Sequence, residues 1–340
     1  MNLSEEKYSK YELVREMLKT SEIVREFDHK ASQPFAEAAK LKKGMFFTGE
    51  GSSRIFPAKR SMVSTLQKGG QTPISTEGAT QAMEYDLKDF AVFGASNSGQ
   101  TKEVVRLFMK LKEAGHDAIF GLTANKNTPL EQLSDNTHIL SCGKEKAVAA
   151  TMSVVEQGLF YDSMLRNMDA EEMTGLNELA DLIERALTMK IDENMVDTMK
   201  NADMIYFAGR NNGVVEELTL KTNEITRKKS DFLEGTYAVH GIEEVMDKNE
   251  LVIIVEPFER EEEKFMECLA EGVNMNVIAI STHETSFPTI RIPDGGEYKE
   301  YVELAAGWNV LVEIGIALGI DLDKPTRARK VGNEYIAENE

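Results

Sequence analysis

Cysteine and long apolar runs are what this sequence has least of. Its 340 residues include two cysteines, Cys142 and Cys268, too few for a disulfide framework, so we interpret both as small core residues in a reducing compartment. No apolar run approaches the about 18 residues of a membrane-spanning helix. The polar N-terminus, which reads MNLSEE, is not typical of a signal peptide. We therefore expect a cytoplasmic protein with no membrane partner.

Positive charge and histidine are also in short supply. The chain carries 39 Lys and Arg against 58 Asp and Glu, a formal net charge of −19. Such a surface repels phosphate backbones and anionic lipids, so we expect no nucleic-acid partner. Its five histidines and two cysteines show no spacing typical of metal ligands. We expect neither a metal site nor a cofactor.

Three short apolar runs occur twice, at offsets of 159 to 161 positions. The pairs are 45–49 with 205–209, 90–94 with 251–255, and 118–123 with 277–282. Continuous apolar runs are typical of strands buried on both faces of a parallel sheet. Helical patterns follow the middle runs at 101–113 and 260–271. The pattern predicts an α/β fold with two tandem doubly wound parallel-sheet domains.

The remaining segments read as helical, with predicted helices at 9–27, 151–167, 175–190 and 298–318. The predicted organisation is an N-terminal helical arm at 1–40, a first α/β domain at 41–165, a helical connector at 166–195, a second α/β domain at 196–324 and a charged tail at 325–340.

The run 90–94 leads directly into Ser96-Asn97-Ser98-Gly99-Gln100-Thr101 and then into a predicted helix. Ligands of open parallel sheets bind at the carboxyl ends of strands, and a helix N-terminus there attracts anions. Helix capping explains one hydroxyl but not three within six residues. The turn Gly51-Ser52-Ser53 follows the run 45–49 and would lie at the same edge. The corresponding segments of the second copy, 211–213 and 256–259, lack these hydroxyls, so we expect one phosphate site, in the first half.

These two motifs resemble the signature of the sugar isomerase (SIS) domain. The duplicated layout, over about residues 10–330, resembles the isomerase half of glucosamine-6-phosphate synthase and its stand-alone relatives, the aminosugar-6-phosphate deaminases and fructosamine-6-phosphate deglycases. The resemblance implies flavodoxin-like domains and a 6-phosphorylated sugar as the substrate. It also implies a set of phosphate-binding residues, with Asn97 standing where the synthase has Gln: Ser53, Ser96, Asn97, Ser98 and Thr101, beside the turn residues Gly51 and Ser52.

The resemblance also implies catalytic residues in the second half. The segment 217–224 fits the family's Glu-x-x-x-Lys-x-x-Glu helix, which makes Glu224 the enolising base and Lys221 its charge partner. Sixteen residues further on, His240 matches the histidine that opens the sugar ring. Lys330, which follows an Asp-x-Pro turn, matches a C-terminal lysine that serves as a Schiff base or electrostatic partner. The alternatives are a simple helical ion pair for Lys221 and Glu224 and a solvated basic tail for Lys330.

We interpret the chain as an enzyme for the aldose–ketose isomerisation of a 6-phosphorylated amino sugar or sugar–amine adduct, with release of ammonia or an amine. The alternatives are a plain phosphosugar isomerase and a non-catalytic phosphosugar sensor. The sequence departs from the family around His240, where Tyr237 and Ile242 replace the usual Glu and Pro, so deaminase and deglycase both stay open. The resemblance further implies a homodimer or homotetramer, with His240 acting across the subunit interface.

Overall fold

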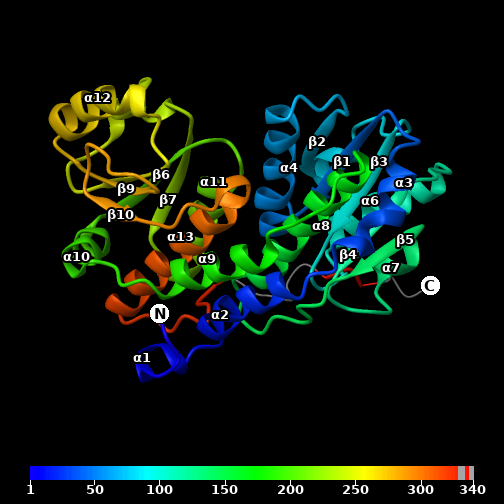
Figure 1. Ribbon diagram of the computed structural model, residues 1–340, viewed down its shortest axis with the longest axis horizontal. Helices are drawn as coiled ribbons and strands as arrows, with labels where there is room; N and C mark the ends of the chain where they lie inside the picture. Colours follow the sequence, from blue (N-terminus) through cyan, green and yellow to red (C-terminus); the bar gives the residue numbers. More distant parts are fainter. Residues whose placement is uncertain (328–333, 337–340) are drawn as a thin grey trace. The chain divides into compact units, whose positions relative to one another are not determined.

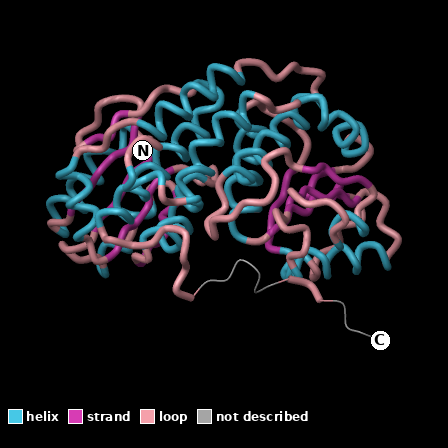
Figure 2. The backbone as a smooth tube through the Cα atoms, turned by 90° about the horizontal axis from the view of Figure 1, so that it is seen from below, coloured by secondary structure: helices cyan, strands magenta, loops and turns pink. Residues whose placement is uncertain are grey.

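The computed structural model describes residues 1–327 and 334–336, so Lys330 lies outside the described residues. Two compact units make up the described chain. The first-sheet unit contains residues 22–146, 150–176 and 334–336, and the second-sheet unit contains residues 1–21, 147–149 and 177–327. In each unit a twisted sheet lies between helices (Figure 1; Figure 2, strands in magenta).

Each unit contains a sheet of five parallel strands. The first sheet has the order β2-β1-β3-β4-β5, with β1 Gly44–Gly49, β2 Ile74–Gly78, β3 Phe90–Ala95, β4 Ile119–Thr123 and β5 Asn136–Ile139. The second has the order β7-β6-β8-β9-β10, with β6 Met204–Gly209, β7 Lys229–Glu234, β8 Leu251–Val255, β9 Asn276–Ser281 and β10 Thr289–Arg291. The two orders are the same when strands are counted within each sheet, as expected for a repeated unit. Two parallel α/β sheets are therefore confirmed.

Helices cover both faces of the first sheet. One face carries α3 (Gln33–Ala39), α4 (Ile55–Gln67) and α8 (Met152–Met168), and the other carries α5 (Ala79–Ala82), α6 (Lys102–Glu113) and α7 (Pro129–Leu133). Neighbouring residues of β1 divide between the two faces. Phe47 stacks on Tyr161 of α8, whereas Phe46 packs with Phe108 of α6. This alternation explains why the strand is apolar throughout.

The second sheet is covered in the same way. One face carries α10 (Glu193–Asn201), α11 (Val214–Lys221) with a π-helical turn (Thr222–Thr226), and α13 (Lys299–Ala317). The other face packs on α12 (Glu262–Phe265) and the π-helix Met266–Val273. The sequence predicted one regular helix at 260–271, so the π-helical part is a correction. The spacing of the apolar residues in the sequence does not distinguish this π-helical hydrogen-bonding pattern from that of a regular α-helix.

The remaining helices are α1 (Glu6–Ser9), α2 (Glu12–Arg25) and α9 (Leu176–Thr188). Single 3₁₀ turns occur at His29–Ser32, Gly51–Ser53, Tyr237–Val239, Ile242–Val245, Glu259–Glu261 and Gly296–Tyr298. Among the described residues, no helix combines the length and the apolar character that crossing a membrane requires.

Gly307 allows α13 to approach α11 closely. A Cβ atom at this position would overlap both terminal methyl groups of Leu218, which is fully buried. Because α11 carries the candidate residue Lys221, this close packing holds the helix on which part of the site depends.

We expect Gly307→Ala to lower the free energy of unfolding by about 1 kcal/mol, because overpacking costs about 1–3 kcal/mol and outweighs the better helix propensity of alanine. Urea unfolding measures the change. In a Leu218→Ala background the overlap is gone, so the same substitution should cost nothing there. Equal losses in both backgrounds would contradict this account of the packing.

Candidate active site

Three hydroxyl groups converge in the loop between β3 and α6. Ser96 Oγ lies 2.7 Å from Thr101 Oγ1 and 3.4 Å from Ser98 Oγ. Backbone N–H groups of the loop point at the same hydroxyls: Gly99 N donates to Ser96 Oγ at 3.1 Å, and Gln100 N donates to Ser98 Oγ at 3.2 Å. The loop therefore gathers N–H and O–H donors at the N-terminus of a 12-residue helix, which is the chemistry that holds an anion.

The glycine in this loop is required by its conformation. Gly99 has φ +68°, and a Cβ atom there would also overlap the side chain of Thr128. Thr101, at the N-cap position, makes no side-chain capping bond to the helix and instead contacts Ser96. Simple helix capping therefore does not account for the Thr101 hydroxyl.

The second predicted turn lies at the end of β1, next to β3 in the sheet. Gly51, Ser52 and Ser53 form a single 3₁₀ turn, and Gly51 has φ +55°. Gly49 approaches this turn so closely that a Cβ atom would lie 2.9 Å from Ala95 O and 3.0 Å from Ser53 O. The half-buried Ser53 has no hydrogen-bond partner for its hydroxyl among the described residues, which leaves that group available to a ligand.

Asn97 points away from the hydroxyl cluster. Its Nδ2 donates to Glu145 Oε2 at 3.2 Å, and the buried Glu145 also accepts from Thr151 N and Ser153 Oγ. Its backbone oxygen accepts from Asn125 Nδ2 and from other donors at the end of β4 and just after it. The structure thus gives Asn97 a part in holding the loop, while its predicted contact with phosphate stays a prediction.

Part of the C-terminal tail reaches the same loop. Tyr335 N donates to Gln100 O at 2.7 Å, and Glu334 pairs antiparallel with Thr101. These residues belong to the first-sheet unit.

In the second-sheet unit, Lys221 lies between two carboxylates at the end of α11. Its Nζ is 2.8 Å from Glu224 Oε2 and 3.3 Å from Glu217 Oε1. The side chains of Lys221 and Glu217 are fully buried, whereas 24% of the Glu224 side chain is exposed. Burial alone would lower the pKa of Lys221, but the two carboxylates outweigh it and raise that pKa above its usual value. Lys221 is therefore an ammonium ion at neutral pH.

Glu224 occupies the π-helical turn that continues α11. The turn spans Thr222–Thr226 and ends at Arg227, which has φ +57°. Such turns are frequent at functional sites because they displace side chains from the regular helix spacing. The Lys221–Glu224 ion pair that the sequence offered as the alternative interpretation is present. It belongs to a triad with Glu217, a residue that the sequence analysis named only as part of the motif.

His240 lies apart from this triad in the network of polar contacts. It is exposed and follows the 3₁₀ turn Tyr237–Val239, and its Nε2 is 3.3 Å from Lys264 Nζ. No polar contact of the described residues joins it to Glu224. The three described residues that were predicted as catalytic, Lys221, Glu224 and His240, therefore do not form one hydrogen-bonded cluster within this unit.

Comparison with known proteins bears on the first half most directly. Residues 42–166 match the family model for the SIS domain. The chain contains a SIS domain. The phosphate-loop motif and the Gly51–Ser53 turn both fall within these residues, so the resemblance stated from the sequence is confirmed.

A curated relative and several solved structures extend the likeness beyond the SIS domain. The glutamine–fructose-6-phosphate aminotransferase (isomerizing) of Aquifex aeolicus is 26% identical over 255 residues, which cover 70% of this chain and 43% of that protein. The chain thus spans less than half the length of that relative.

Three solved structures cover nearly the whole chain. The C-terminal domain of glucosamine-fructose-6-phosphate aminotransferase from Francisella tularensis has a TM-score of 0.77 at 17% identity and covers 93% of this chain and 98% of its own. Tagatose-6-phosphate ketose/aldose isomerase from Escherichia coli has a TM-score of 0.75 at 18% identity, with coverages of 94% and 98%. Glucosamine-6-phosphate deaminase from Thermotoga maritima is similar, with a TM-score of 0.74 at 18% identity and coverages of 95% and 98%. At these identities the likeness shows a shared fold.

One buried carboxyl group, outside the residues that match the SIS domain, was not predicted from the sequence. Glu303 on α13 is 2% exposed, and burial raises its pKa to about 8. The negative charges of Glu300 and Glu256 act in the same direction, while Lys299 and Arg210 oppose them only in part. The signal was present in the sequence, because Glu303 is the one charged residue in a mostly apolar stretch, YVELAAGWNVLV.

We expect Lys221→Met to lower the free energy of unfolding by about 3 kcal/mol or more, because it leaves the buried carboxylate of Glu217 and the partly exposed one of Glu224 without their cation. Urea unfolding, monitored by circular dichroism, measures this loss. Lys200→Met is the matched control, since Lys200 pairs with Asp197 at the surface at 4.0 Å and its removal should cost about 0.5 kcal/mol or less. Similar losses for the two variants would show that the buried triad is not a stabilising element.

We expect the stability of the protein to depend on the protonation of Glu303. Its folded pKa of about 8 lies above the ordinary value of 4.5, so the folded state keeps a proton that the unfolded state releases. The free energy of unfolding should therefore fall as pH rises from about 4.5 to about 8. Glu303→Gln removes this contribution, and its stability advantage over the original protein should grow across that range.

Denaturant unfolding at a series of pH values tests the Glu303 prediction. The exposed Glu263, changed to Gln, serves as the control and should show no such trend. A difference between Glu303→Gln and the original protein that stays constant with pH would contradict the prediction.

Proposed function

We propose that this protein is an enzyme that enolises a 6-phosphorylated amino sugar or sugar–amine adduct and releases ammonia or an amine. The observation that carries the proposal is the convergence of the Ser96, Ser98 and Thr101 hydroxyls at the N-terminus of α6. A phosphosugar substrate agrees with the names of the similar proteins, which refer to phosphorylated sugars.

The phosphate end of the proposed site uses neutral donors. Ser53, Ser98 and Thr101 would supply hydroxyls, with Ser96 holding the loop in shape and also facing the anion. Backbone N–H groups and the partial positive charge of the helix N-terminus add to them. Such a site can hold one phosphate even though the chain carries a net charge of −19.

The proposed proton transfer uses Glu224. Its carboxylate is partly exposed while its partner Lys221 is buried, so a sugar can reach the carboxylate but not the amine. A carboxylate in this position can move a proton between C1 and C2 through an enediol. Because Lys221 keeps its proton, we assign it charge stabilisation of the carboxylates rather than Schiff-base chemistry.

Ring opening is assigned to His240. An imidazole both accepts and donates a proton near neutral pH, and the neighbouring Lys264 ammonium can donate to its Nε2. The exposure of His240 suits a residue that serves the substrate of another subunit, so the proposal includes a homodimer or homotetramer. To Lys330 we assign the role that the family resemblance implies, that of a Schiff base or an electrostatic partner of the substrate.

Proton NMR in D₂O with a panel of phosphosugars tests the reaction. The panel contains glucosamine-6-phosphate, galactosamine-6-phosphate, fructose-6-phosphate and 6-phosphofructosyl amino acids. Deuterium incorporation at C1 or C2 with amine release supports the proposal and separates deaminase from deglycase. Exchange without amine release would instead indicate a plain isomerase, and binding without exchange a sensor.

We expect Glu224→Gln to abolish deuterium exchange while phosphosugar affinity stays within a few-fold, because the amide keeps the shape of the side chain but cannot accept the proton. Glu193→Gln on the exposed surface of α10 is the control and should keep the full rate. A Glu224→Gln protein with an undiminished exchange rate would refute the assignment.

A substitution in the phosphate loop should affect substrate binding instead of proton transfer. Ser96→Ala should weaken phosphosugar binding by about 10-fold or more, because a hydrogen bond to a charged group contributes about 1.5–3 kcal/mol. The two substitutions thus separate substrate affinity from turnover.

A further inference from the structure

The second sheet has its own crevice at the point where its strand order reverses. Strands β6 and β8 are neighbours but connect in opposite directions, and open α/β sheets bind ligands outside the carboxyl ends of such strands. A cavity of about 700 Å³ lies there in the second-sheet unit. In the repeat, its lining residues Arg210 and Pro257 take the places of Glu50 and Ser96. At these positions the second copy therefore carries a guanidinium group in place of a carboxylate and has lost the hydroxyl of Ser96.

Arg210 is fixed in this cavity but has no acidic partner. Its Nη1 donates to the backbone oxygen of Glu256, and its Cζ lies 4.3 Å from the centre of the Phe258 ring. Within residues 1–327 and 334–336, neither Arg210 nor Arg260 has a carboxylate at ion-pair distance. Guanidinium N–H donors held in place without a carboxylate are suited to bind one from a ligand.

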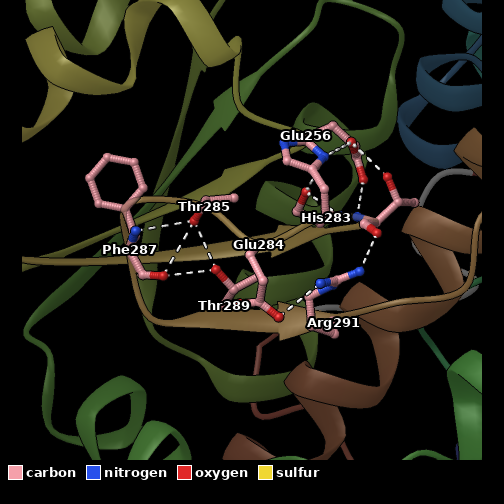
Figure 3. Close-up of polar contacts among 9 residues, drawn as sticks. Glu256, His283, Glu284, Thr285, Phe287, Thr289 and Arg291 are labelled. Carbon is pink, nitrogen blue, oxygen red and sulfur yellow. Dashed lines mark hydrogen bonds and ion pairs between the residues drawn. The ribbon is translucent and has the colours of Figure 1, made fainter.

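The carboxylate of Glu256, which lines the cavity, is already engaged. Glu256 Oε1 accepts from Thr282 N at 2.5 Å, and its Oε2 lies 3.3 Å from Thr282 Oγ1 (Figure 3). Glu256 has φ +48°, a left-handed conformation that costs a non-glycine residue free energy and is enriched at functional sites. This geometry turns the Glu256 carboxylate toward the end of β9, while its carbonyl group holds Arg210.

His283 completes the polar base of the cavity. Its Nδ1 is 3.1 Å from Ser281 Oγ and 3.7 Å from Glu256 Oε2 (Figure 3). Because Ser281 and Glu256 both approach the same ring nitrogen, the three residues are not a catalytic triad, which needs its base between the two partners. The other ring nitrogen, Nε2, is buried and has no hydrogen-bond partner in the described part of the chain.

Two further carboxylates line the same cavity from the turn that precedes α12. Glu259 and Glu261 have no cation at ion-pair distance among the described residues, although both lie beside Arg260 in the lining. The cavity thus presents unpaired groups of both signs together with the apolar surface of Phe258. A ligand that matches this pattern carries an anionic group and an ammonium group.

We propose that this cavity binds a free α-amino acid, with its carboxylate on Arg210 and its ammonium group on Glu259 and Glu261. The volume lies within the 300–1,000 Å³ that is usual for small-molecule sites. The cavity belongs to the second-sheet unit, whereas the phosphate loop belongs to the first-sheet unit.

Saturation-transfer NMR on the full chain tests the proposal without any phosphosugar. The probes are free alanine, aspartate, lysine and phenylalanine, each with its N-acetyl derivative and its methyl ester. We expect at least one free amino acid to bind, and both blocked forms to bind about 10-fold more weakly or worse, since each loses one charged hydrogen-bonding group. This comparison requires no mutation.

Variants locate the site. The double substitution Glu259→Gln and Glu261→Gln changes partly or fully exposed side chains and should weaken binding about 10-fold, as should Arg210→Met. Ser96→Ala in the phosphate loop is the control and should leave amino-acid affinity unchanged.

The proposal is overturned if no free amino acid binds, if acetate or inorganic phosphate binds as tightly as the amino acids do, or if the cavity variants keep full affinity. None of these results bears on phosphosugar turnover, which is measured separately.

Discussion

Parallel strands whose order reverses part-way across a sheet determine where this protein can do chemistry. In each sheet the two strands at the reversal end side by side, and the segments that follow them diverge to opposite faces. In the first sheet these segments are the Gly51–Ser53 turn and the loop from Ser96 to Thr101. In the second they begin with Arg210 and Glu256. The same backbone geometry thus presents hydroxyls in one copy and charged groups in the other.

A second constraint comes from the buried charge on α11. Lys221 can stay inside the protein only because Glu217 and Glu224 compensate it, and the pair of carboxylates needs the lysine for the same reason. The π-helical turn gives this arrangement an asymmetry, since one carboxylate is fully buried and the other is partly exposed. A helix with regular spacing and a solvated ion pair would not produce one sheltered cation with one accessible base.

Much of this architecture could be predicted from the sequence. The central strands β1, β3, β4, β6, β8 and β9 are continuous apolar runs because both of their faces are covered, and such runs are visible in the sequence. The edge strands β2, β5, β7 and β10 were not predicted. Their outer sides lack a neighbouring strand, and β2, for example, is only partly buried, so they carry mixed residues without a clear period.

The site residues likewise divide into those that could be predicted from the sequence and those that could not. Ser96, Ser98 and Thr101 lie within six positions, so their convergence could be predicted from local sequence. Arg210, Glu256 and His283 are brought together from three strand ends, more than 70 positions apart at the extremes. Asn97 lies within the local motif, but its side chain bonds to Glu145, and nothing within the motif indicates that partner.

The enclosure of Lys221 has a practical consequence for chemical labelling. Acylating and reductive-alkylating reagents attack the neutral amine of a lysine, and this one is both inaccessible and held in its protonated form. In the native protein, such reagents will modify the exposed lysines and pass over Lys221. Its modification marks molecules in which α11 has opened, so a single peptide bearing that residue reports the integrity of the site in a mass spectrum.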